Sequence, residues 1–173
     1  KNFGDLVEYP MVKGLKGTPE IVPVVKLKHE TVNFGGMWHS DTSYTETPPM
    51  GSILVAREIP PFGGDTLFAN QALAYERLSE GMKELIKVLI GVSSSAKREV
   101  AESRQNLVAA SNEQKTRELR AEHPVVRTHP ETREKILYVN YGHTIHFKGM
   151  TEEESAPILN YLFKHQSRPE FCC

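Results

Sequence analysis

Residues 38–44 read Trp38-His39-Ser40-Asp41-Thr42-Ser43-Tyr44, and this segment is the strongest guide to the architecture of the chain. Side chains at i and i+2 of a β-strand point to the same face, so an extended backbone would bring the His39 imidazole and the Asp41 carboxylate together. With one further histidine, such a pair makes the three-ligand set of non-haem Fe(II) sites. A sequence with seven histidines and three aspartates contains one His-x-Asp by chance in roughly a tenth of cases. On the tripeptide alone, a surface histidine beside a turn aspartate is therefore the simpler interpretation.

Length and charge limit the kinds of partner. The chain has 173 residues, which is enough for one domain with a sizeable core. Lys and Arg total 21 and Asp and Glu total 22, so the formal net charge is -1. This balance gives no electrostatic reason to expect nucleic acid or an anionic membrane as a partner. No apolar run approaches the roughly 18 residues of a membrane helix, so no membrane span is predicted.

The cysteines and the chain ends bear on the cellular compartment. Cys172 and Cys173 are adjacent and are the only cysteines, so a disulfide scaffold is excluded and a reducing cytoplasm is expected. The chain begins at Lys1, without Met and without the pattern of a signal peptide. We therefore expect this sequence to be a fragment of a longer chain.

The first 70 residues are predicted to form strands and turns. Short runs of β-branched and apolar residues predict strands at 21–27, 52–59 and 66–69, and the pattern is strongest at 52–59. Gly-Gly and Pro-Pro pairs separate these segments, as is typical of turns.

Capping residues predict three helices. Asn70 and Ser79 are good N-caps for two helices that carry apolar residues at helical spacing. Thr151 and Glu154 form the capping box of a third helix. Pro157 lies in the second turn of that helix and is expected to weaken its start.

Residues 93–122 are predicted to form an exposed helix or a mobile insertion, because they are polar and contain few large apolar residues. A lid over a site is the functional alternative for this segment. The segments 124–128 and 136–140 flank Pro130-Glu131-Thr132-Arg133 and predict a hairpin with a loop of about four to five residues. Together these patterns predict an α+β fold in which helices decorate a β-sheet core.

Four motifs occur in order along the chain. They are the motif of residues 38–44, Thr47-Pro48-Pro49, Gly63-Gly64-Asp65-Thr66-Leu67 and His123-Pro124-Val125-Val126-Arg127-Thr128-His129-Pro130. In this order and at this spacing they closely resemble the taurine dioxygenase/2,4-dichlorophenoxyacetate dioxygenase (TauD/TfdA) family of Fe(II)- and 2-oxoglutarate-dependent enzymes. The resemblance runs from Phe3-Gly4-Asp5-Leu6 to Arg168-Pro169-Glu170-Phe171, which is nearly the whole chain.

The resemblance implies both a fold and a reaction. Family members are mainly β proteins with helices (α+β), built on a double-stranded β-helix, the cupin-like jelly roll. Residues 1–173 would then be a single, partial dioxygenase domain with an incomplete jelly roll. The implied reaction uses dioxygen and 2-oxoglutarate to hydroxylate a small anionic substrate, and it releases succinate and CO2. The substrate would be a sulfonate, an alkyl sulfate or an aryloxyalkanoate, and family members are often homo-oligomers.

The resemblance also assigns the metal and co-substrate residues. His39 and Asp41 match the first two Fe(II) ligands of the family. Thr66 matches the threonine whose hydroxyl donates a charge-assisted hydrogen bond to a carboxylate of 2-oxoglutarate. Without the resemblance, Thr66 would be interpreted as an ordinary strand threonine.

The substrate pocket is assigned in the same way. Thr42 and Tyr44 follow the ligands and are expected to border the substrate, as is Tyr9. His143 lies where the family places a pocket side chain, although a polar residue at a strand end explains it equally well. Taurine-specific members carry His where this chain has Tyr9 and Asn where it has Gly35, so those sulfonate contacts are missing here.

The family's third iron ligand, a distal His, and an Arg that binds 2-oxoglutarate follow the stretch that matches Arg168-Pro169-Glu170-Phe171. None of the histidines after Asp41 fits the distal position, and His123, His129 and His165 are expected to be structural. Two hypotheses remain open. One is an oxygenase of which this chain is a part. The other is a truncated, catalytically inactive relative that serves as a binding or assembly module.

Overall fold

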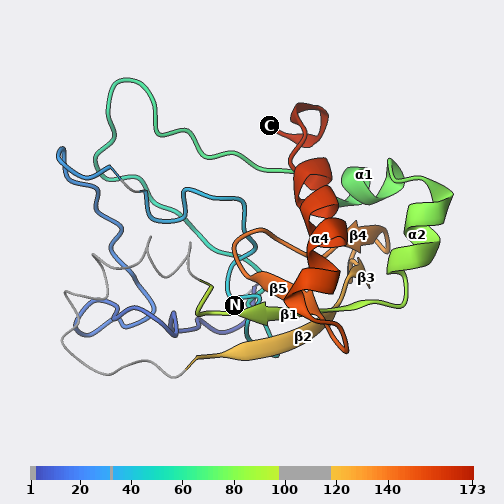
Figure 1. Ribbon diagram of the computed structural model, residues 1–173. Helices are drawn as coiled ribbons and strands as arrows, with labels where there is room; N and C mark the ends of the chain where they lie inside the picture. Colours follow the sequence, from blue (N-terminus) through green and yellow to red (C-terminus); the bar gives the residue numbers. More distant parts are fainter. Residues whose placement is uncertain (1–2, 32, 98–117) are drawn as a thin grey trace.

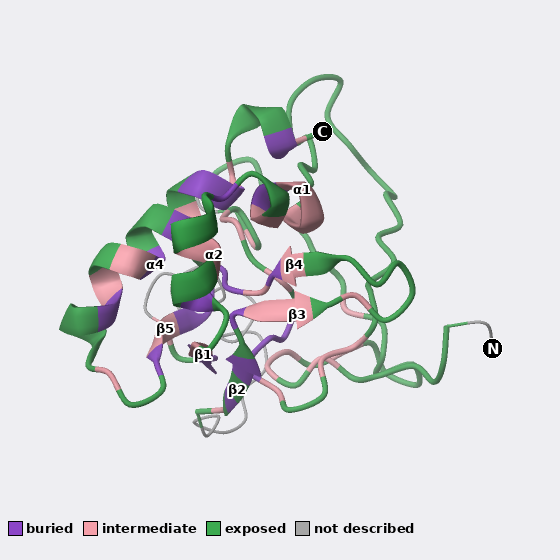
Figure 2. Ribbon diagram, turned by 90° about the vertical axis from the view of Figure 1, so that its right-hand side faces the viewer, coloured by how far each residue is buried: buried purple, intermediate pink, exposed green. Residues whose placement is uncertain are grey.

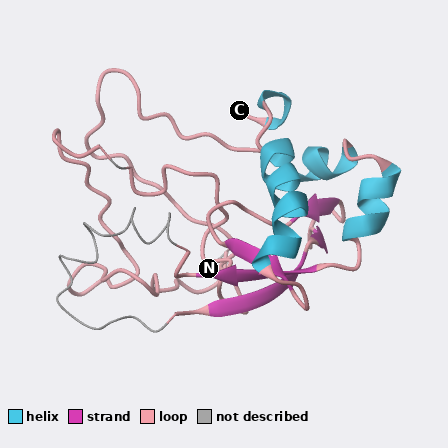
Figure 3. Cartoon of the chain, in the orientation of Figure 1, coloured by secondary structure: helices cyan, strands magenta, loops and turns pink. Residues whose placement is uncertain are grey.

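The structure is a computed structural model, and it describes residues 3–31, 33–97 and 118–173 (Figure 1). Helices and strands lie together on one side of the molecule, whereas residues before 70 run as loops on the other side (Figure 3). In chain order the elements are α1 (Gln71–Glu76), α2 (Glu80–Ile86), β1 (Ile90–Ser94), β2 (Arg120–Pro124), β3 (Val126–Thr128), β4 (Lys135–Leu137), β5 (Thr144–Phe147), α4 (Glu152–Gln166) and the 3-10 helix η1 (Pro169–Phe171).

The larger sheet has three antiparallel strands in the order β2-β1-β5. Strand β1 pairs with β2 from Ile90 opposite Pro124 to Ser94 opposite Arg120. Its pairing with β5 shifts register between Val92 and Ser93, which marks a bulge. The central strand β1 is therefore hydrogen-bonded to a neighbour along both of its edges. Strand β5 leads directly into the turn that precedes α4.

The smaller sheet is the hairpin β3-β4, in which Val126 lies opposite Leu137 and Thr128 opposite Lys135. The predicted hairpin is thus confirmed, although its loop, residues 129–134, is longer than expected. Arg133 adopts a left-handed φ of 65° within that loop. The expected mixture of helices and antiparallel sheets is also confirmed, and the described helices contain more residues than the described strands.

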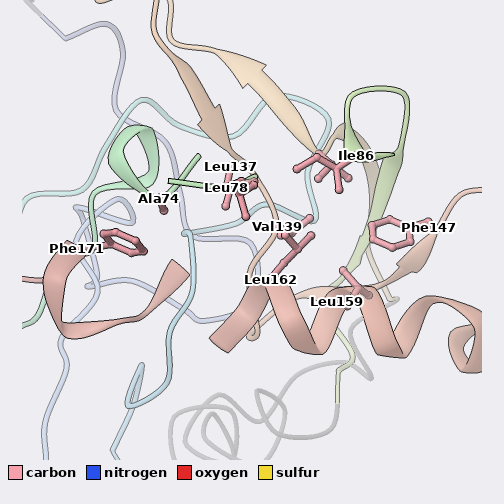
Figure 4. Packing of buried hydrophobic residues seen from close by; sticks show 10 residues of the cluster. Ala74, Leu78, Ile86, Leu137, Val139, Phe147, Leu159, Leu162 and Phe171 are labelled. Carbon is pink, nitrogen blue, oxygen red and sulfur yellow. The ribbon is translucent and has the colours of Figure 1, made fainter. Parts of the chain in front are cut away.

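The core lies between α4, the helices α1 and α2, and the two sheets (Figures 2 and 4). Ten buried apolar residues form one cluster, and every one of them comes after residue 70. They are Ala74, Leu78, Ile86, Val125, Leu137, Val139, Phe147, Leu159, Leu162 and Phe171. Each large side chain in such a cluster contributes about 1.5–3 kcal/mol by leaving water.

The three predicted helix starts are confirmed. The Asn70 side chain accepts hydrogen bonds from two backbone N–H groups of the first turn of α1, each at 3.0 Å. Ser79 accepts one from Met82 at 3.3 Å at the start of α2. At α4, the Glu154 N–H donates to the Thr151 hydroxyl at 3.2 Å and the Thr151 N–H donates to the Glu154 carboxylate at 2.8 Å. These bonds satisfy N–H groups that a helix start leaves without a partner.

Pro157 does not interrupt α4, which runs without a break from Glu152. A proline here removes only the hydrogen bond that residue 157 would donate to the Glu153 carbonyl. The capping box fixes the first turn, and the buried residues Leu159 and Leu162 fix the following turns against the core. Tertiary packing and capping together therefore outweigh the expected weakening.

The predicted strands at 21–27, 52–59 and 66–69 are wrong. The first two segments contain no strand, and the third makes only an isolated bridge between Ala69 and Cys172. A strand is stabilised by a hydrogen-bonded neighbour, and no described segment pairs with 52–59. Apolar side chains there stay in water, and Ile53, for example, is 84% exposed.

The exposed helix or mobile insertion predicted at 93–122 has the wrong bounds at both ends. Residues 93–94 belong to β1 and residues 120–122 belong to β2. Ser94 and Ser95 are buried, and their hydroxyls find partners: Ser94 donates to Glu118 at 2.5 Å, and Ser95 accepts from the Leu119 N–H at 3.0 Å. The predicted lid falls on residues 98–117, outside the described part of the chain.

No helix within the described residues is long and apolar enough to cross a membrane.

Replacing Thr151 with Ala removes the hydroxyl of the capping box. We expect Thr151→Ala to lower the free energy of unfolding by about 1 kcal/mol in a urea titration. Asn160→Ala is the matched control, because Asn160 is exposed on the same helix and Ala is the better helix former. Equal stability of Thr151→Ala and wild type would contradict a contribution from the capping box.

Candidate metal site

The imidazole of His39 and the carboxylate of Asp41 converge, with Nε2 3.1 Å from Oδ1. They do so without a strand, since His39 lies in an irregular segment and Asp41 begins a turn. The convergence of the two side chains was therefore predicted correctly. The strand that was expected to bring them together was wrong. Both groups reach solvent, with 31% of the His39 side chain and 47% of the Asp41 side chain exposed.

The orientation of His39 is fixed by its second ring nitrogen. Nδ1 lies 2.7 Å from the carbonyl oxygen of Met37, which accepts the Nδ1 proton. Nε2 therefore faces Asp41. This is the usual arrangement of a metal-binding histidine, whose other nitrogen donates to a backbone carbonyl and fixes the ring.

Asp41 is held as an anion. Oδ2 accepts a hydrogen bond from the Ser52 hydroxyl at 2.5 Å, while Oδ1 faces His39. The pKa of Asp41 is lowered from its ordinary value to about 2, chiefly by the hydrogen bond with His39. Partial burial opposes this shift, and the Ser52 hydroxyl and the charges of His39 and His143 add to it. The carboxylate is therefore ionised at neutral pH, as metal binding requires.

His39 Nε2 and Asp41 Oδ1, 3.1 Å apart, would both be within reach of one ion. One imidazole and one carboxylate suit Fe(II) and similar divalent ions. Across the described residues, no three His, Cys, Asp or Glu side chains come together as a complete metal site.

The turn after Asp41 adopts an unusual backbone conformation. Thr42 has φ of 47°, a left-handed value that is rare for a β-branched residue. Its carbonyl accepts hydrogen bonds from the Thr45 N–H at 2.9 Å and from the Thr45 hydroxyl at 2.8 Å. Thr42 and Tyr44 are both buried, so this strained turn is embedded in the fold.

A second turn, residues 140–144, supports the segment that carries the ligands. We call residues 38–45 the ligand segment and residues 140–144 the supporting turn. The Gly142 N–H donates to the Trp38 carbonyl at 3.0 Å. A Cβ on Gly142 would lie 2.7 Å from the His39 Cβ, so only glycine allows this approach.

Aromatic contacts complete the site. The His143 ring packs edge-on against Tyr44 with centroids 4.8 Å apart, and lies edge-on to His39 at 6.3 Å. His143 directly precedes β5 and is buried, so it lies at a strand end, and its place in a substrate pocket stays a prediction.

Thr66 and Tyr9 occupy other surroundings. Thr66 is exposed, in the irregular segment between the Gly63-Gly64 turn and α1, and it makes no hydrogen bond to the metal pair within the described chain. Tyr9 packs edge-on against Phe34, with centroids 6.4 Å apart.

Four supporting residues were not predicted from the sequence: Ser43, Ser52, Asn140 and Gly142. Asn140-Tyr141-Gly142 has the composition of a turn, and this was the one available indication. Nothing local indicates which distant segment that turn contacts.

His123, His129 and His165 make hydrogen bonds within the fold. His165 is buried, with Nε2 2.8 Å from the Ala74 carbonyl. His123 is buried, with Nε2 3.0 Å from the Thr45 carbonyl, and so it supports the end of the ligand segment. In the β3-β4 loop, His129 Nδ1 accepts from two backbone N–H groups at 3.2 and 3.3 Å.

His39 and Asp41 form a His–carboxylate pair, and comparison with known proteins places the chain in a family. Residues 1–173 match the family described as "Taurine catabolism dioxygenase TauD, TfdA family". The chain belongs to this family, whose members are 2-oxoglutarate-dependent dioxygenases.

Two curated relatives illustrate the similarity. The chain is 32% identical to "Alpha-ketoglutarate-dependent dioxygenase cnsM" of Penicillium expansum, over 99% of this chain and 50% of that protein. It is 33% identical to "Alkylsulfatase" of Acinetobacter baylyi, over 97% of this chain and 53% of that protein. The chain therefore spans about half the length of the curated relatives it matches.

Two solved structures also resemble this chain. A taurine dioxygenase from Burkholderia xenovorans superposes with a TM-score of 0.64 and 35% identity, over 84% of this chain and 46% of that one. The structure of AAD-2 in complex with Mn(II) and N-oxalylglycine also gives a TM-score of 0.64, with 30% identity over 79% of this chain and 46% of that one.

Adding a methyl group at Gly142 should displace His39. We expect Gly142→Ala to lower the free energy of unfolding by about 1–3 kcal/mol, because its Cβ would overlap the ligand segment. Gly81→Ala is the matched control: it lies in α2 with nothing within 4 Å of the added Cβ, and should be neutral or stabilising. If the two variants have the same stability, the close approach at His39 is not a constraint.

His123 should make stability depend on pH. Burial is the main cause that lowers the pKa of His123 below the ordinary 6.5, and the hydrogen bond to Thr45 opposes it. The unfolded chain then takes up the proton first, so stability is full above pH 6.5 and falls as the pH drops through the folded pKa. His123→Gln keeps a donor for the Thr45 carbonyl and should flatten this decrease. An NMR titration of His123 that gave a pKa of 6.5 or higher would refute the assignment.

Proposed function

We propose that this chain is part of an Fe(II)- and 2-oxoglutarate-dependent dioxygenase that hydroxylates a small anionic organic substrate and forms succinate and CO2. The observation that carries the proposal is the pair of His39 Nε2 and Asp41 Oδ1, 3.1 Å apart, in a member of the TauD/TfdA family. The full fold is a double-stranded β-helix, to which this chain contributes one portion.

His39 and Asp41 would hold the iron. His39 binds through Nε2 while Nδ1 keeps its bond to Met37, and Asp41 binds through Oδ1 while Oδ2 keeps its bond to Ser52. The third ligand, a histidine, comes from outside residues 1–173. When bound, iron supplies the activation of dioxygen that is coupled to decarboxylation of 2-oxoglutarate.

Thr66 binds the co-substrate in this proposal. A threonine hydroxyl donates a charge-assisted hydrogen bond to a carboxylate, and Thr66 is exposed and therefore accessible to one. The support for this role is the Gly-Gly-Asp-Thr motif shared with the family.

Tyr9, Thr42, Tyr44 and His143 border the substrate. Tyr44 and His143 form a buried edge-on pair beside the metal ligands, which supports a position next to the reacting carbon. Relatives named alkylsulfatase and 2,4-dichlorophenoxyacetate dioxygenase support an alkyl sulfate, sulfonate or aryloxyalkanoate substrate. Tyr9 and Gly35 replace the residues with which taurine-specific members hold their substrate, so taurine itself is disfavoured.

The proposed enzyme acts in the cytoplasm on dioxygen and small molecules, with neither nucleic acid nor membrane as a partner. A formal net charge of -1 and two free cysteines, Cys172 and Cys173, support this setting.

The test is a substrate screen on a chain that carries residues 1–173 within the full length of its relatives. We expect consumption of 2-oxoglutarate with one of the three substrate classes. Asp41→Ala should reduce turnover to background, because only one of the two ligands then remains from this portion. Glu131→Ala is the matched control, since it removes an exposed carboxylate in the β3-β4 loop. Residues 1–173 alone should release no succinate.

Two results would oppose the proposal. Full turnover by Asp41→Ala would remove Asp41 from the ligands. A full-length chain that binds no Fe(II) and consumes no 2-oxoglutarate would favour the alternative, an inactive relative acting as a binding or assembly module.

A further inference from the structure

We propose that Asn140 is a positioning residue that sets the angle between His39 and Asp41. This inference rests on the metal-binding function proposed above. The Asn140 side chain bonds to Ser43 and His143, and it acts by joining the supporting turn (residues 140–144) to the ligand segment (residues 38–45).

Both ends of the Asn140 side chain are engaged. Its Nδ2 donates to the Ser43 hydroxyl at 3.1 Å, and its Oδ1 accepts from the His143 N–H at 2.9 Å. Asn140 is 5% exposed and Ser43 is 1% exposed, so water cannot replace either bond at low cost. The amide therefore links the turn that carries Asp41 to the backbone of the residue whose ring packs beside His39.

Asn140 is itself anchored to the sheet. Its backbone N–H donates to the Thr144 hydroxyl at 3.0 Å, and its carbonyl accepts from the Thr144 N–H at 3.0 Å. The His143 carbonyl accepts from the Ser94 N–H of β1 at 2.9 Å. The supporting turn thus closes on Thr144, the first residue of β5, and is joined to β1 through His143.

The two links from this turn lie on either side of the metal pair. Gly142 holds Trp38, the residue before His39, and Asn140 holds Ser43, two residues after Asp41. The ligand segment has no strand of its own to fix its backbone. If the second link is cut, His39 stays attached through Trp38 while the turn that carries Asp41 can rotate. Partners of this kind typically change metal affinity by about 10- to 100-fold.

The test compares Asn140→Ala with Val139→Ala in a chain that carries residues 1–173 within the full length of its relatives. Val139 is the adjacent residue, is 3% exposed and belongs to the apolar core, so its truncation destabilises the fold without touching the network. The first readout is the dissociation constant for Mn(II), followed by EPR at a temperature where both variants are folded. The second readout is the NMR signals of the His39 ring without metal.

We expect Asn140→Ala to raise the Mn(II) dissociation constant about tenfold or more and to shift the His39 ring signals. Val139→Ala should change the dissociation constant less than about twofold and leave the His39 ring signals at their wild-type positions. Ser43→Ala should weaken Mn(II) binding to a similar extent. The double variant, Ser43→Ala with Asn140→Ala, should bind Mn(II) little more weakly than either single variant. The proposal is overturned if Asn140→Ala leaves both readouts at wild-type values, or changes them no more than Val139→Ala.

The failure of this proposal can be separated from the failure of the proposed function. If wild type and Asp41→Ala bind Mn(II) equally, the metal function fails. If the His39 signals then still respond to Asn140→Ala and not to Val139→Ala, the positioning of the pair stands. If wild type binds Mn(II) through Asp41 but the two test variants behave alike, the metal function stands and the positioning role fails.

Discussion

The hydrogen bond from the Gly142 N–H to the Trp38 carbonyl, 3.0 Å long, connects two parts of the protein that share no sheet. On one side lies the part of the molecule that contains the sheets, the helices and the apolar core. On the other lies a loop-rich region that carries both candidate metal ligands. The approach of the backbones is possible only because residue 142 has no side chain. The geometry of the metal pair is thereby fixed by a sheet to which neither ligand belongs.

Local chemistry explains what could be predicted of the fold. The helix caps form hydrogen bonds with backbone groups only a few residues away. The helices therefore begin where Asn70, Ser79 and the Thr151–Glu154 capping box predict. The strand predicted at 52–59 depends on a partner that local sequence does not specify, and no described segment pairs with it. Ser94 and Ser95 were assigned to an exposed segment for a related reason. Their hydroxyls form hydrogen bonds with Glu118 and Leu119, which are distant in the sequence.

The same distinction applies to the site. The spacing of His39 and Asp41 and the order of the motifs indicated the ligand pair, and the structure brings the pair together. The strand expected to do so is absent, and the left-handed conformation of Thr42 and its hydrogen bonds to Thr45 turn the chain instead. Asn140 escaped notice because its role depends on Ser43, 97 residues earlier in the chain.

That separation of 97 residues also determines when the site forms. Closing a loop of this length costs about 4 kcal/mol of chain entropy, whereas the β3-β4 hairpin closes over only residues 129–134. The hairpin and the capped helices can assemble early, and the two ligands acquire their relative orientation only after the sheet exists. In the reverse direction, the loop-rich region can detach while the sheet and core persist. Circular dichroism would then report a folded protein whose imidazole and carboxylate no longer face each other.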